Sequence, residues 1–238
     1  MKRVFYSFFA LAALCCLSFA VSCQGTAPAS DAGASRVEKI LEHLHNPQSK
    51  YVIVVSHRGD WRDYPENSIP AIESVIRMGV DMVELDIAMT KDSVLVLSHD
   101  RTLDRCTNGK GRISEITYDS LQSFTLKSAH GGDFGYKLRI PTLREALEVC
   151  KDRILINIDK GYDYYDQVLA LTEELGVTHQ ILIKGGMPLA DVKKKMAAHK
   201  NNLLYMPIIT PANKAHQPLL EEYLASEPQL AYEICWSE

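Results

Sequence analysis

The sequence predicts an α/β protein, and among such folds it favours a (β/α)8 barrel over a doubly wound open sheet. From about residue 36 onward, short apolar runs alternate with amphipathic helical segments, which indicates parallel strands joined by helical crossovers. Several apolar runs end in polar or charged residues, at the edge where barrels carry their functional groups. No G-x-G-x-x-G motif follows the first apolar run, so a dinucleotide site is not indicated.

Each predicted element follows from its local pattern. Short runs rich in Val, Ile, Leu and Tyr between polar segments are typical of buried strands, and longer segments with apolar residues at helical spacing are typical of helices. The predicted strands are YVIVVS (51–56), VELDIAM and VLVLS within 83–100, ILINID (154–159), QILIK, LLYMPI and LAYEI. The predicted helices are RVEKILEHLH, NSIPAIESVIRMG, TLREALEVC, and segments near 164–175, 189–199 and 217–225.

Two of the predicted helices carry recognisable end signals. Asn67 is expected to be the N-cap of the second helix, with Pro70 in its first turn and Gly79 as its stop. Thr142 and Glu145 stand at the spacing of a capping box, which predicts the start of the next helix.

The predicted strands do not complete a barrel. Residues 36–238, the predicted barrel domain, contain seven such runs, whereas a barrel closes with eight strands and takes roughly 250 residues. The sequence stops at YEICWSE, just after the seventh run. We therefore expect a barrel that is incomplete at its C-terminal end or closed in another way. An incomplete barrel would leave the edges of its first and last strands open.

The first 22 residues resemble a secretory signal peptide. Lys2 and Arg3 precede a long apolar run, and small residues lead to Cys23. Gly, Pro and Ser follow directly, which favours a signal over a membrane-spanning helix. Cys23 stands as in a bacterial lipoprotein box, although Ala20 replaces the usual Leu, so both lipidation and plain cleavage stay open. With 23–35 as a flexible tether, we expect export to the periplasm or cell envelope and anchoring through Cys23.

Charge and cysteine content narrow the classes of partner. The chain has 26 basic and 30 acidic residues, so it is a poor candidate for nucleic-acid binding and must hold any phosphate locally. Beyond the first 23 residues only Cys106, Cys150 and Cys235 remain. Their odd number and wide spacing do not indicate a disulfide framework, and no CxxC or His-rich spacing indicates zinc.

Three acidic residues lie within or at the end of apolar strands. Glu84 and Asp86 alternate with apolar residues, so they share one face of their strand, and Asp159 ends another strand. Two like charges on one buried face raise each other's pKa or cost several kcal/mol unless a positive charge lies between them. Hard divalent cations fill this role and keep positions open for phosphate oxygens. The pattern therefore predicts a divalent metal site.

Two histidines stand at strand ends beside these acids. His57 follows the first strand and His99 the third, and paired imidazoles suit a general acid and a general base. Arg58 carries a planar cation that fits phosphate, although an ion pair with Glu66 or Asp60 is an equal interpretation of its spacing. Metal, arginine and two histidines together indicate phosphoryl chemistry on an ester.

Five blocks of sequence between about residues 51 and 160 stand in a recognisable order. They are SHRGD, PENSIPAI, GVDMVELDIAMTKDSVLVLSHDRTLDRCTNGKG, IPTLREAL and ILINIDK. Together they resemble the motifs of the glycerophosphodiester phosphodiesterase family. The resemblance implies a (β/α)8 barrel of the phospholipase C-like phosphodiesterase type. It also implies a Ca²⁺- or Mg²⁺-dependent activity that splits glycerophosphodiesters into an alcohol and glycerol 3-phosphate. From this we expect a phosphodiesterase that acts on glycerophosphodiesters or on lysolipid headgroups.

The resemblance also implies a role for each matching position. By position it implies metal binding by Glu84, Asp86 and Asp159, acid and base roles for His57 and His99, phosphate binding by Arg58 and Lys160, and support of the first loop by Glu66 and Asn67. It further implies that residues 107–141 form an insertion that helps to shape the substrate pocket.

The end of the fourth strand departs from the family pattern. Family members usually carry Glu, an apolar residue and then Lys, whereas here Asp159 is followed directly by Lys160. Asp is one methylene shorter than Glu, so the metal is expected to be displaced or held more weakly. Lys160 is expected to reach phosphate from the opposite strand register.

Three other functions stay open at this point. A related phospholipase C-type enzyme would release a cyclic phosphate instead of the open product. A lipid-anchored module would bind phosphate headgroups without turnover, and a degenerate, truncated copy would fold poorly. The sequence does not choose among them, nor does it assign which histidine is the acid.

Overall fold

The computed structural model describes residues 34–127, 137–226 and 228–236. The predicted signal segment, Cys23 and nearly all of the predicted tether lie outside the described residues. The chain divides into two compact units, Met1–Gly33 and Ala34–Glu238, and every described residue belongs to the second. Among the described helices, none combines the length and the apolar character needed to cross a bilayer.

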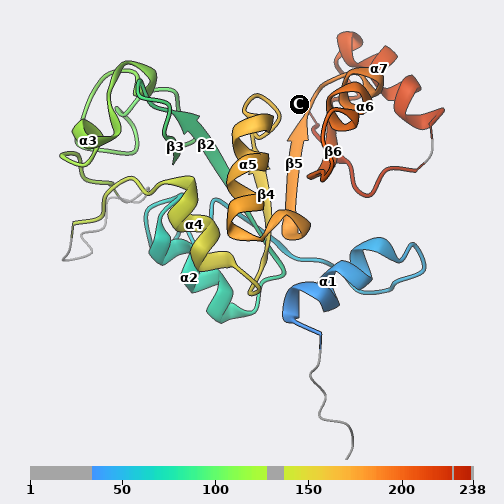
Figure 1. Ribbon diagram of the computed structural model, residues 1–238, viewed down its shortest axis with the longest axis horizontal. Helices are drawn as coiled ribbons and strands as arrows, with labels where there is room; N and C mark the ends of the chain where they lie inside the picture. Colours follow the sequence, from blue (N-terminus) through green and yellow to red (C-terminus); the bar gives the residue numbers. More distant parts are fainter. Residues whose placement is uncertain (1–33, 128–136, 227, 237–238) are drawn as a thin grey trace, which may run out of the picture. The chain divides into compact units, whose positions relative to one another are not determined.

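Helices and strands alternate along the second unit (Figure 1). The described strands are β1 (Val55–His57), β2 (Met82–Met89), β3 (Leu95–Leu97), β4 (Leu155–Asp159), β5 (Ile181–Gly185), β6 (Leu204–Ile209) and β7 (Glu233–Ile234). The described α-helices are α1 (Arg36–His45), α2 (Ile69–Met78), α3 (Tyr118–Leu121), α4 (Leu143–Cys150), α5 (Tyr165–Leu175), α6 (Leu189–Ala197) and α7 (Gln217–Leu224). Each predicted strand and helix therefore has a counterpart in the structure.

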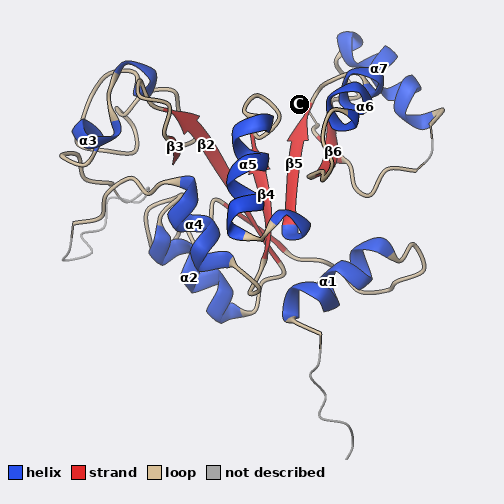
Figure 2. Cartoon of the chain, in the orientation of Figure 1, coloured by secondary structure: helices blue, strands red, loops and turns tan. Residues whose placement is uncertain are grey.

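The strands form a parallel sheet of the barrel type. Their order is β1-β2-β4-β5-β6-β7, and each pair of neighbours along this order is parallel. Figure 2 shows β4 and β5 side by side in the middle of this order. Parallel strands that are neighbours in the sheet are joined by segments that contain a helix, as crossover connections between parallel strands usually do. Six of the seven described strands are thus parallel strands of a (β/α)8-type barrel, and among these six β1 and β7 end the order without pairing to each other.

One predicted strand has a different role from the one expected. The sequence placed the run at 94–99 as a parallel strand of the barrel, but β3 pairs antiparallel with β2 and lies off the main order. The reason is the connection: Thr90, Lys91, Asp92, Ser93 and Val94 are too few residues for a crossover, and they form a tight hairpin turn instead. Ser93 takes a left-handed backbone conformation in this turn, with φ of 65°.

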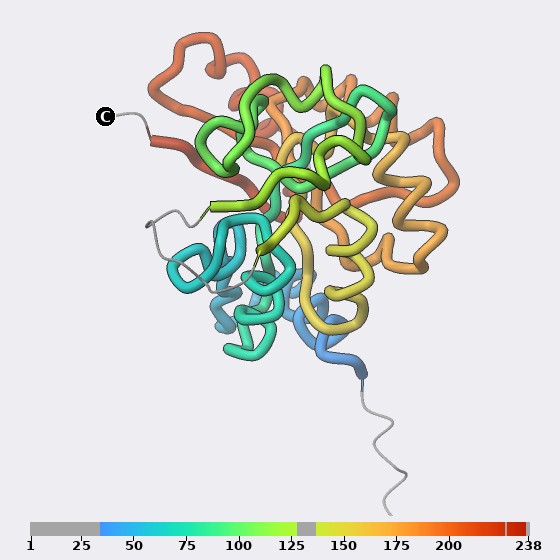
Figure 3. The backbone as a smooth tube through the Cα atoms, turned by 90° about the vertical axis from the view of Figure 1, so that its left-hand side faces the viewer, coloured from blue at the N-terminus to red at the C-terminus, as the bar shows by residue number. Residues whose placement is uncertain are grey.

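The two faces of the sheet bury different sets of residues. The face toward the helices carries the largest apolar cluster, which includes Val83, Leu85, Ile87, Ile156, Ile158, Ile181 and Ile183. The opposite, inner face begins with an apolar layer at the first residues of the strands, formed by Met82, Leu155, Leu182 and Met206. Helix α1 covers this layer with Val37 and Ile40, which are both buried. Figure 3 shows α1, in blue, at the end of the sheet opposite the green segment that follows β3.

The predicted insertion at 107–141 forms a small layer of its own. Its described part contains α3 and a short 3-10 helix, Ile113–Glu115. A separate apolar cluster holds it together, with Val96, Leu103, Ile113, Leu121 and Ile140 as its buried members. Residues 128–136, inside the insertion, lie outside the described residues.

Two local expectations need correction. Helix α2 is capped by Ser68, whose side chain accepts the amide hydrogen of Ala71, and not by Asn67. Asn67 is unavailable because its backbone is left-handed and its side chain binds elsewhere. Strand β1 is shorter than the predicted run at 51–56, since only its end pairs with β2. The signals of Pro70 and Gly79 in α2, and the capping box of α4, are confirmed.

Candidate functional site

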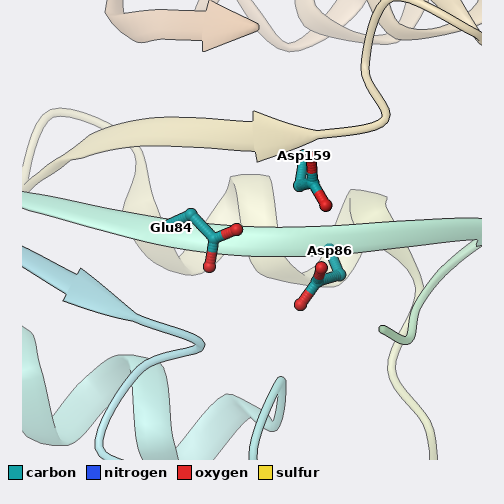
Figure 4. Close-up of side chains that lie close together, drawn as sticks. All are labelled: Glu84, Asp86 and Asp159. Atoms are coloured by element: carbon teal, nitrogen blue, oxygen red, sulfur yellow. The ribbon is translucent and has the colours of Figure 1, made fainter. Parts of the chain in front are cut away.

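The three acids singled out in the sequence meet on the inner face of the sheet. Glu84 and Asp86 lie on β2, and Asp86 is paired across the ladder with Asp159 at the end of β4. One carboxylate oxygen from each of the three lies within 4.8 Å of the others. Figure 4 shows the three side chains on the same side of the two strands. We refer to Glu84, Asp86 and Asp159 as the acid cluster.

Burial makes the charges of this cluster costly. Glu84 is 4% exposed and Asp86 is 1% exposed. Desolvation raises the pKa of Glu84 above its ordinary value, and the neighbouring Asp86 charge raises it further. Desolvation also raises the pKa of Asp86, although the amide of Asn67 and nearby cations partly oppose this shift. The cluster is therefore a set of carboxylates whose ionised forms need a cation close by.

The cluster offers the donor set of a hard divalent cation. Carboxylate oxygens are the ligands that Ca²⁺ and Mg²⁺ prefer, and three of them converge here. Asn157 lies opposite Glu84 on the neighbouring strand, and its buried side-chain oxygen has no hydrogen-bond donor within the described residues. A buried oxygen without a donor beside carboxylates fits a site for a positive ion or for its bound water.

The end of β1 and the loop after it place a histidine, His57, and an arginine, Arg58, beside the acid cluster. Arg58 has a left-handed backbone, with φ of 57°, and its amide donates to the main-chain oxygen of Glu84 at 2.9 Å. Its guanidinium Nε lies 3.3 Å from Asp86 Oδ2. Gly59 follows, also left-handed, and a Cβ there would lie 3.0 Å from the backbone of Ala71, so this turn requires glycine.

Asn67 fixes Asp86 by two hydrogen bonds. Its amide nitrogen donates to Asp86 Oδ2 at 2.9 Å, and its side-chain oxygen accepts the backbone amide of Asp86 at 3.1 Å. Its own backbone amide donates to the carbonyl of Arg58 at 3.0 Å, which closes the loop. The left-handed backbone of Asn67, with φ of 55°, allows all three contacts. Asn67 therefore links the loop after β1 to Asp86 on β2.

Both predicted histidines lie at the edge of the cluster. His57 Nε2 is 4.0 Å from Glu84 Oε2, and its side chain is 62% exposed. His99 follows β3, and its Nδ1 lies 2.6 Å from Asp100 Oδ1. The Asp100 carboxylate thereby orients the His99 ring, which leaves the opposite ring nitrogen free of this bond. The charge of His99 also acts on Asp86, which places the two side chains in one electrostatic environment.

An arginine that sequence reasoning missed, Arg105, joins the loop after β3 to the loop after β1. Arg105 donates to Asp100 Oδ2 at 2.7 Å and to both carboxylate oxygens of Glu66 at 2.7 and 2.8 Å. Glu66 in turn accepts Arg58 Nη1 at 3.1 Å, so the ion pair weighed for Arg58 is present. Hydrogen bonds from Arg105 hold the pKa of Asp100 well below its ordinary range. Sequence spacing could not predict this role of Arg105, because Glu66 lies 39 residues earlier in the chain.

Two lysines approach the acid cluster from neighbouring strands. Lys160, predicted to bind phosphate, has a left-handed backbone and donates to the carbonyl of His99, with Nζ 3.9 Å from Asp86 Oδ1. Lys184, on β5, was not predicted, and its Nζ lies 3.2 Å from Glu84 Oε1. The signal for Lys184 was present, since a charged residue ends the apolar run QILIK as Asp159 ends ILINID.

The sequence matches one known family over most of the described unit. The profile of the glycerophosphoryl diester phosphodiesterase family matches residues 57–210. This span begins at His57 and includes the acid cluster, His99, Arg105 and both lysines.

Curated relatives carry the corresponding name. A glycerophosphodiester phosphodiesterase of Caldanaerobacter subterraneus is 36% identical over 163 residues, which are 64% of this chain and 66% of that protein. The human glycerophosphodiester phosphodiesterase 1 is 40% identical over 101 residues, which are 42% of this chain and 30% of that protein. The aligned parts thus span under two thirds of the length of these relatives.

Solved structures have the same fold. A glycerophosphodiester phosphodiesterase from Thermotoga maritima aligns with a TM-score of 0.58 and 25% identity, over 79% of this chain and 75% of that chain. A phosphodiesterase from Oleispira antarctica, solved with its product sn-glycerol-3-phosphate, aligns with a TM-score of 0.57 and 26% identity. That alignment covers 71% of each chain.

Proposed function

Since the chain belongs to the glycerophosphoryl diester phosphodiesterase family, we propose that it hydrolyses glycerophosphodiesters to an alcohol and glycerol 3-phosphate. The observation that carries this proposal is the acid cluster, with its three oxygens within 4.8 Å, flanked by His57, Arg58 and the loop of His99. The product complex of the Oleispira relative supports the substrate class.

We propose that the acid cluster holds a divalent cation, Ca²⁺ or Mg²⁺. When bound, such a cation supplies positive charge against the phosphate oxygens, on which negative charge develops during the reaction. Asn67 keeps Asp86 in a single orientation through its two hydrogen bonds, so one ligand of the site is held in place before the cation binds.

The remaining residues act on the ester itself. Arg58 and Lys160 place cations beside Asp86, where they would bind the substrate phosphate. His57 ends β1 and His99 lies in the loop after β3, so the two imidazoles come from different elements, which suits one proton transfer to the leaving oxygen and one from the attacking group. The attacking group is a water molecule or a neighbouring hydroxyl of the substrate. Asp100 and Arg105 hold the ring of His99 in position.

The proposal is tested by turnover of glycerophosphocholine, glycerophosphoethanolamine and glycerophosphoinositol with Mg²⁺, with Ca²⁺ and with chelator. We expect activity that the chelator abolishes and one of the two ions restores. His57→Ala and His99→Ala should each lower kcat/KM by about 10² to 10⁴, the usual contribution of a general acid or base. Phosphorus NMR of the products identifies any cyclic phosphate.

His199→Ala is the matched control for these variants. His199 is also paired with an aspartate, with Nε2 3.2 Å from Asp166, but it lies just after the end of α6 and makes this contact outside the acid cluster. We expect wild-type turnover from this variant. Unchanged activity in both His57→Ala and His99→Ala would rule out the catalytic role and leave a headgroup-binding module.

The localisation is a separate proposal that rests on the sequence before residue 24. We propose that the protein is exported and anchored in the cell envelope through lipidated Cys23. In cells, Cys23→Ala should move the protein from the membrane fraction to the soluble fraction and remove the incorporation of labelled fatty acid. Soluble wild-type protein without label would contradict anchoring, and an uncleaved N-terminus would contradict export.

A further inference from the structure

Lys184 is the most enclosed cation of the site. It is 8% exposed, and its Nζ contacts carboxylates from three other strands. The distances are 3.2 Å to Glu84, 3.8 Å to Asp159 and 2.9 Å to Glu233. Lys160, by comparison, is 31% exposed at its side chain and donates to a main-chain carbonyl. No role assigned so far uses Lys184 or Glu233.

Two of the three partners of Lys184 belong to the acid cluster. Its ammonium therefore neutralises oxygens of Glu84 and Asp159 that a divalent cation would use. Two cations on the same oxygens repel each other, so the ammonium and the ion compete there. Glu233, on β7, is outside the acid cluster, and it makes the shortest contact with Lys184. Glu233 can still pair with the Lys184 ammonium when a divalent cation binds Glu84 and Asp159.

Lys184 lies directly beside Asp159 in the sheet. Ile158 and Ile183 are partners in the ladder between β4 and β5, so the following residues, Asp159 and Lys184, lie side by side on the inner face. Strand β5 thus places a buried cation next to one acid of the cluster.

We propose that Lys184 is a further substrate-binding residue, shared between two partners. Before a divalent cation binds, its ammonium neutralises the acid cluster; afterwards Glu233 holds it at the edge of the cluster, where it binds a phosphate oxygen. Glu233 is a positioning residue that acts through Lys184. This inference rests on the proposed function for the identity of the phosphate ligand.

The first test measures the affinity of the full chain for Ca²⁺ and Mg²⁺ alone, by titration calorimetry. We expect Lys184→Met to bind the ion about tenfold more tightly, because a competing cation is gone. Glu233→Gln should bind it several-fold more weakly, because Lys184 then stays on the acid cluster. In the Lys184→Met background, Glu233→Gln should have no further effect, since Glu233 acts through the lysine. Additive effects of the two substitutions would overturn the positioning role.

The second test measures binding of inorganic phosphate at saturating Ca²⁺ or Mg²⁺. We expect Lys184→Met to weaken binding about 10- to 100-fold, the usual effect of losing a hydrogen bond to a charged group. Glu233→Gln should weaken it less, and Lys184→Arg should keep most of the affinity. Lys195→Met and Asp166→Asn are matched controls from a surface pair with Nζ 3.2 Å from the carboxylate, and both should bind as the wild type.

The outcomes separate this inference from the proposed function. Wild-type phosphate affinity in folded Lys184→Met would overturn the inference, as would a wild-type chain that binds no phosphate. If Lys184→Met does not fold, the variants Glu233→Gln and Lys184→Arg test the inference in its place. Wild-type affinities of Glu233→Gln for the ion and for phosphate would then overturn the inference. If the wild type binds phosphate through Lys184 but hydrolyses none of the diesters, the proposed function fails while the assignment of Lys184 stands.

Discussion

The two ends of the inner face of the sheet differ in chemistry although the same strands build them. At the first residues of the strands, Met82, Leu155 and Leu182 form the apolar layer that α1 covers. Two to four residues later, the same side of the same strands carries the acid cluster and Lys184. Residues i, i+2 and i+4 of a strand share a face, so each strand passes from core to site within five positions.

This comparison teaches that stability and chemistry are separated along the strands. The apolar layer gains free energy of folding from burial, at about 25 cal/mol per Å² of apolar surface. The acid cluster does the opposite, because burial raises the pKa values of Glu84 and Asp86 and so penalises their charged forms. The apolar layer supports the strands that hold these charges together. Substitutions at the two ends should therefore have different consequences.

The largest effect is expected at the charged end. Asp86→Asn should lower kcat/KM by about 10³, because it removes one of the charged oxygens proposed to hold the divalent cation and weakens the local field on the phosphate. The same change should raise the midpoint of thermal unfolding without added ion, because a buried charge is removed. Turnover assays and calorimetric unfolding measure the two effects. Loss of both activity and stability would contradict the separation.

A comparable change at the apolar end should act on stability alone. Leu182→Ala, at a position 2% exposed, should lower the free energy of unfolding by about 3 kcal/mol, as is usual for a core leucine. The folded fraction should keep the wild-type KM and kcat, because Leu182 touches the core layer and not the ester. Denaturant unfolding and steady-state kinetics check this prediction. A tenfold loss of kcat in folded protein would show that the two ends are coupled.

A smaller, pH-dependent effect is expected where the loops after β1 and β3 meet. Arg105→Leu removes the hydrogen bonds that hold the pKa of Asp100 below its ordinary value. A lowered folded pKa stabilises the fold above the unfolded value, near 4, and this contribution is lost as the pH falls through the folded pKa. The variant should therefore be less stable than the wild type at pH 7, by about 1 kcal/mol. The difference should shrink below pH 4.

Denaturant unfolding at pH 7, 5 and 3 measures this profile. Arg144→Leu serves as the control, because Arg144, on α4, pairs with Glu174 on exposed helix surface. A difference between Arg105→Leu and wild type that is constant over this pH range would rule out Asp100 as its source.

The smallest effect is expected at the start of α1, the helix that covers the apolar layer. The Ser35 hydroxyl accepts a hydrogen bond from the backbone amide of Glu38, and the Glu38 carboxylate accepts one from the backbone amide of Ser35. The two bonds complete a capping box. Ser35→Ala should lower the free energy of unfolding by about 1 kcal/mol and leave turnover unchanged. Thermal unfolding resolves a change of this size, and reduced turnover would contradict the separation of the two ends.

Some features of the site were within reach of the sequence because their causes are local. Alternation along one strand placed Glu84 and Asp86 on the same face, and the spacing of Thr142 and Glu145 predicted a capping box that is present. The cap of α2 was assigned to the wrong residue, Asn67. From spacing alone Asn67 and Ser68 are equivalent caps, and the distant Asp86 decides between them.

Other features depend on contacts that spacing does not contain. Arg105 binds Glu66, 39 residues earlier, and this contact exists only because β3 folds back on β2 as a hairpin. The antiparallel direction of β3 follows from the short connection between β2 and β3. This connection can be seen in the sequence, but the expected alternation of strands and helices in a barrel led to a parallel assignment. Contacts between residues far apart in the chain depend on strand order, and strand order is a property of the packed sheet.

The sequence by itself determined the alternation of strands and helices, the face on which each strand carries its charges, and the family motifs that run through them. These are local, because backbone geometry sets the period of a strand or a helix. Tertiary structure alone decided which charges meet: Lys184 reaches Glu84 across 100 residues, and Glu233 closes the same ion cluster from the last strand. Parallel strands bring such residues together because their ends share one edge of the sheet, in an order that no single strand encodes.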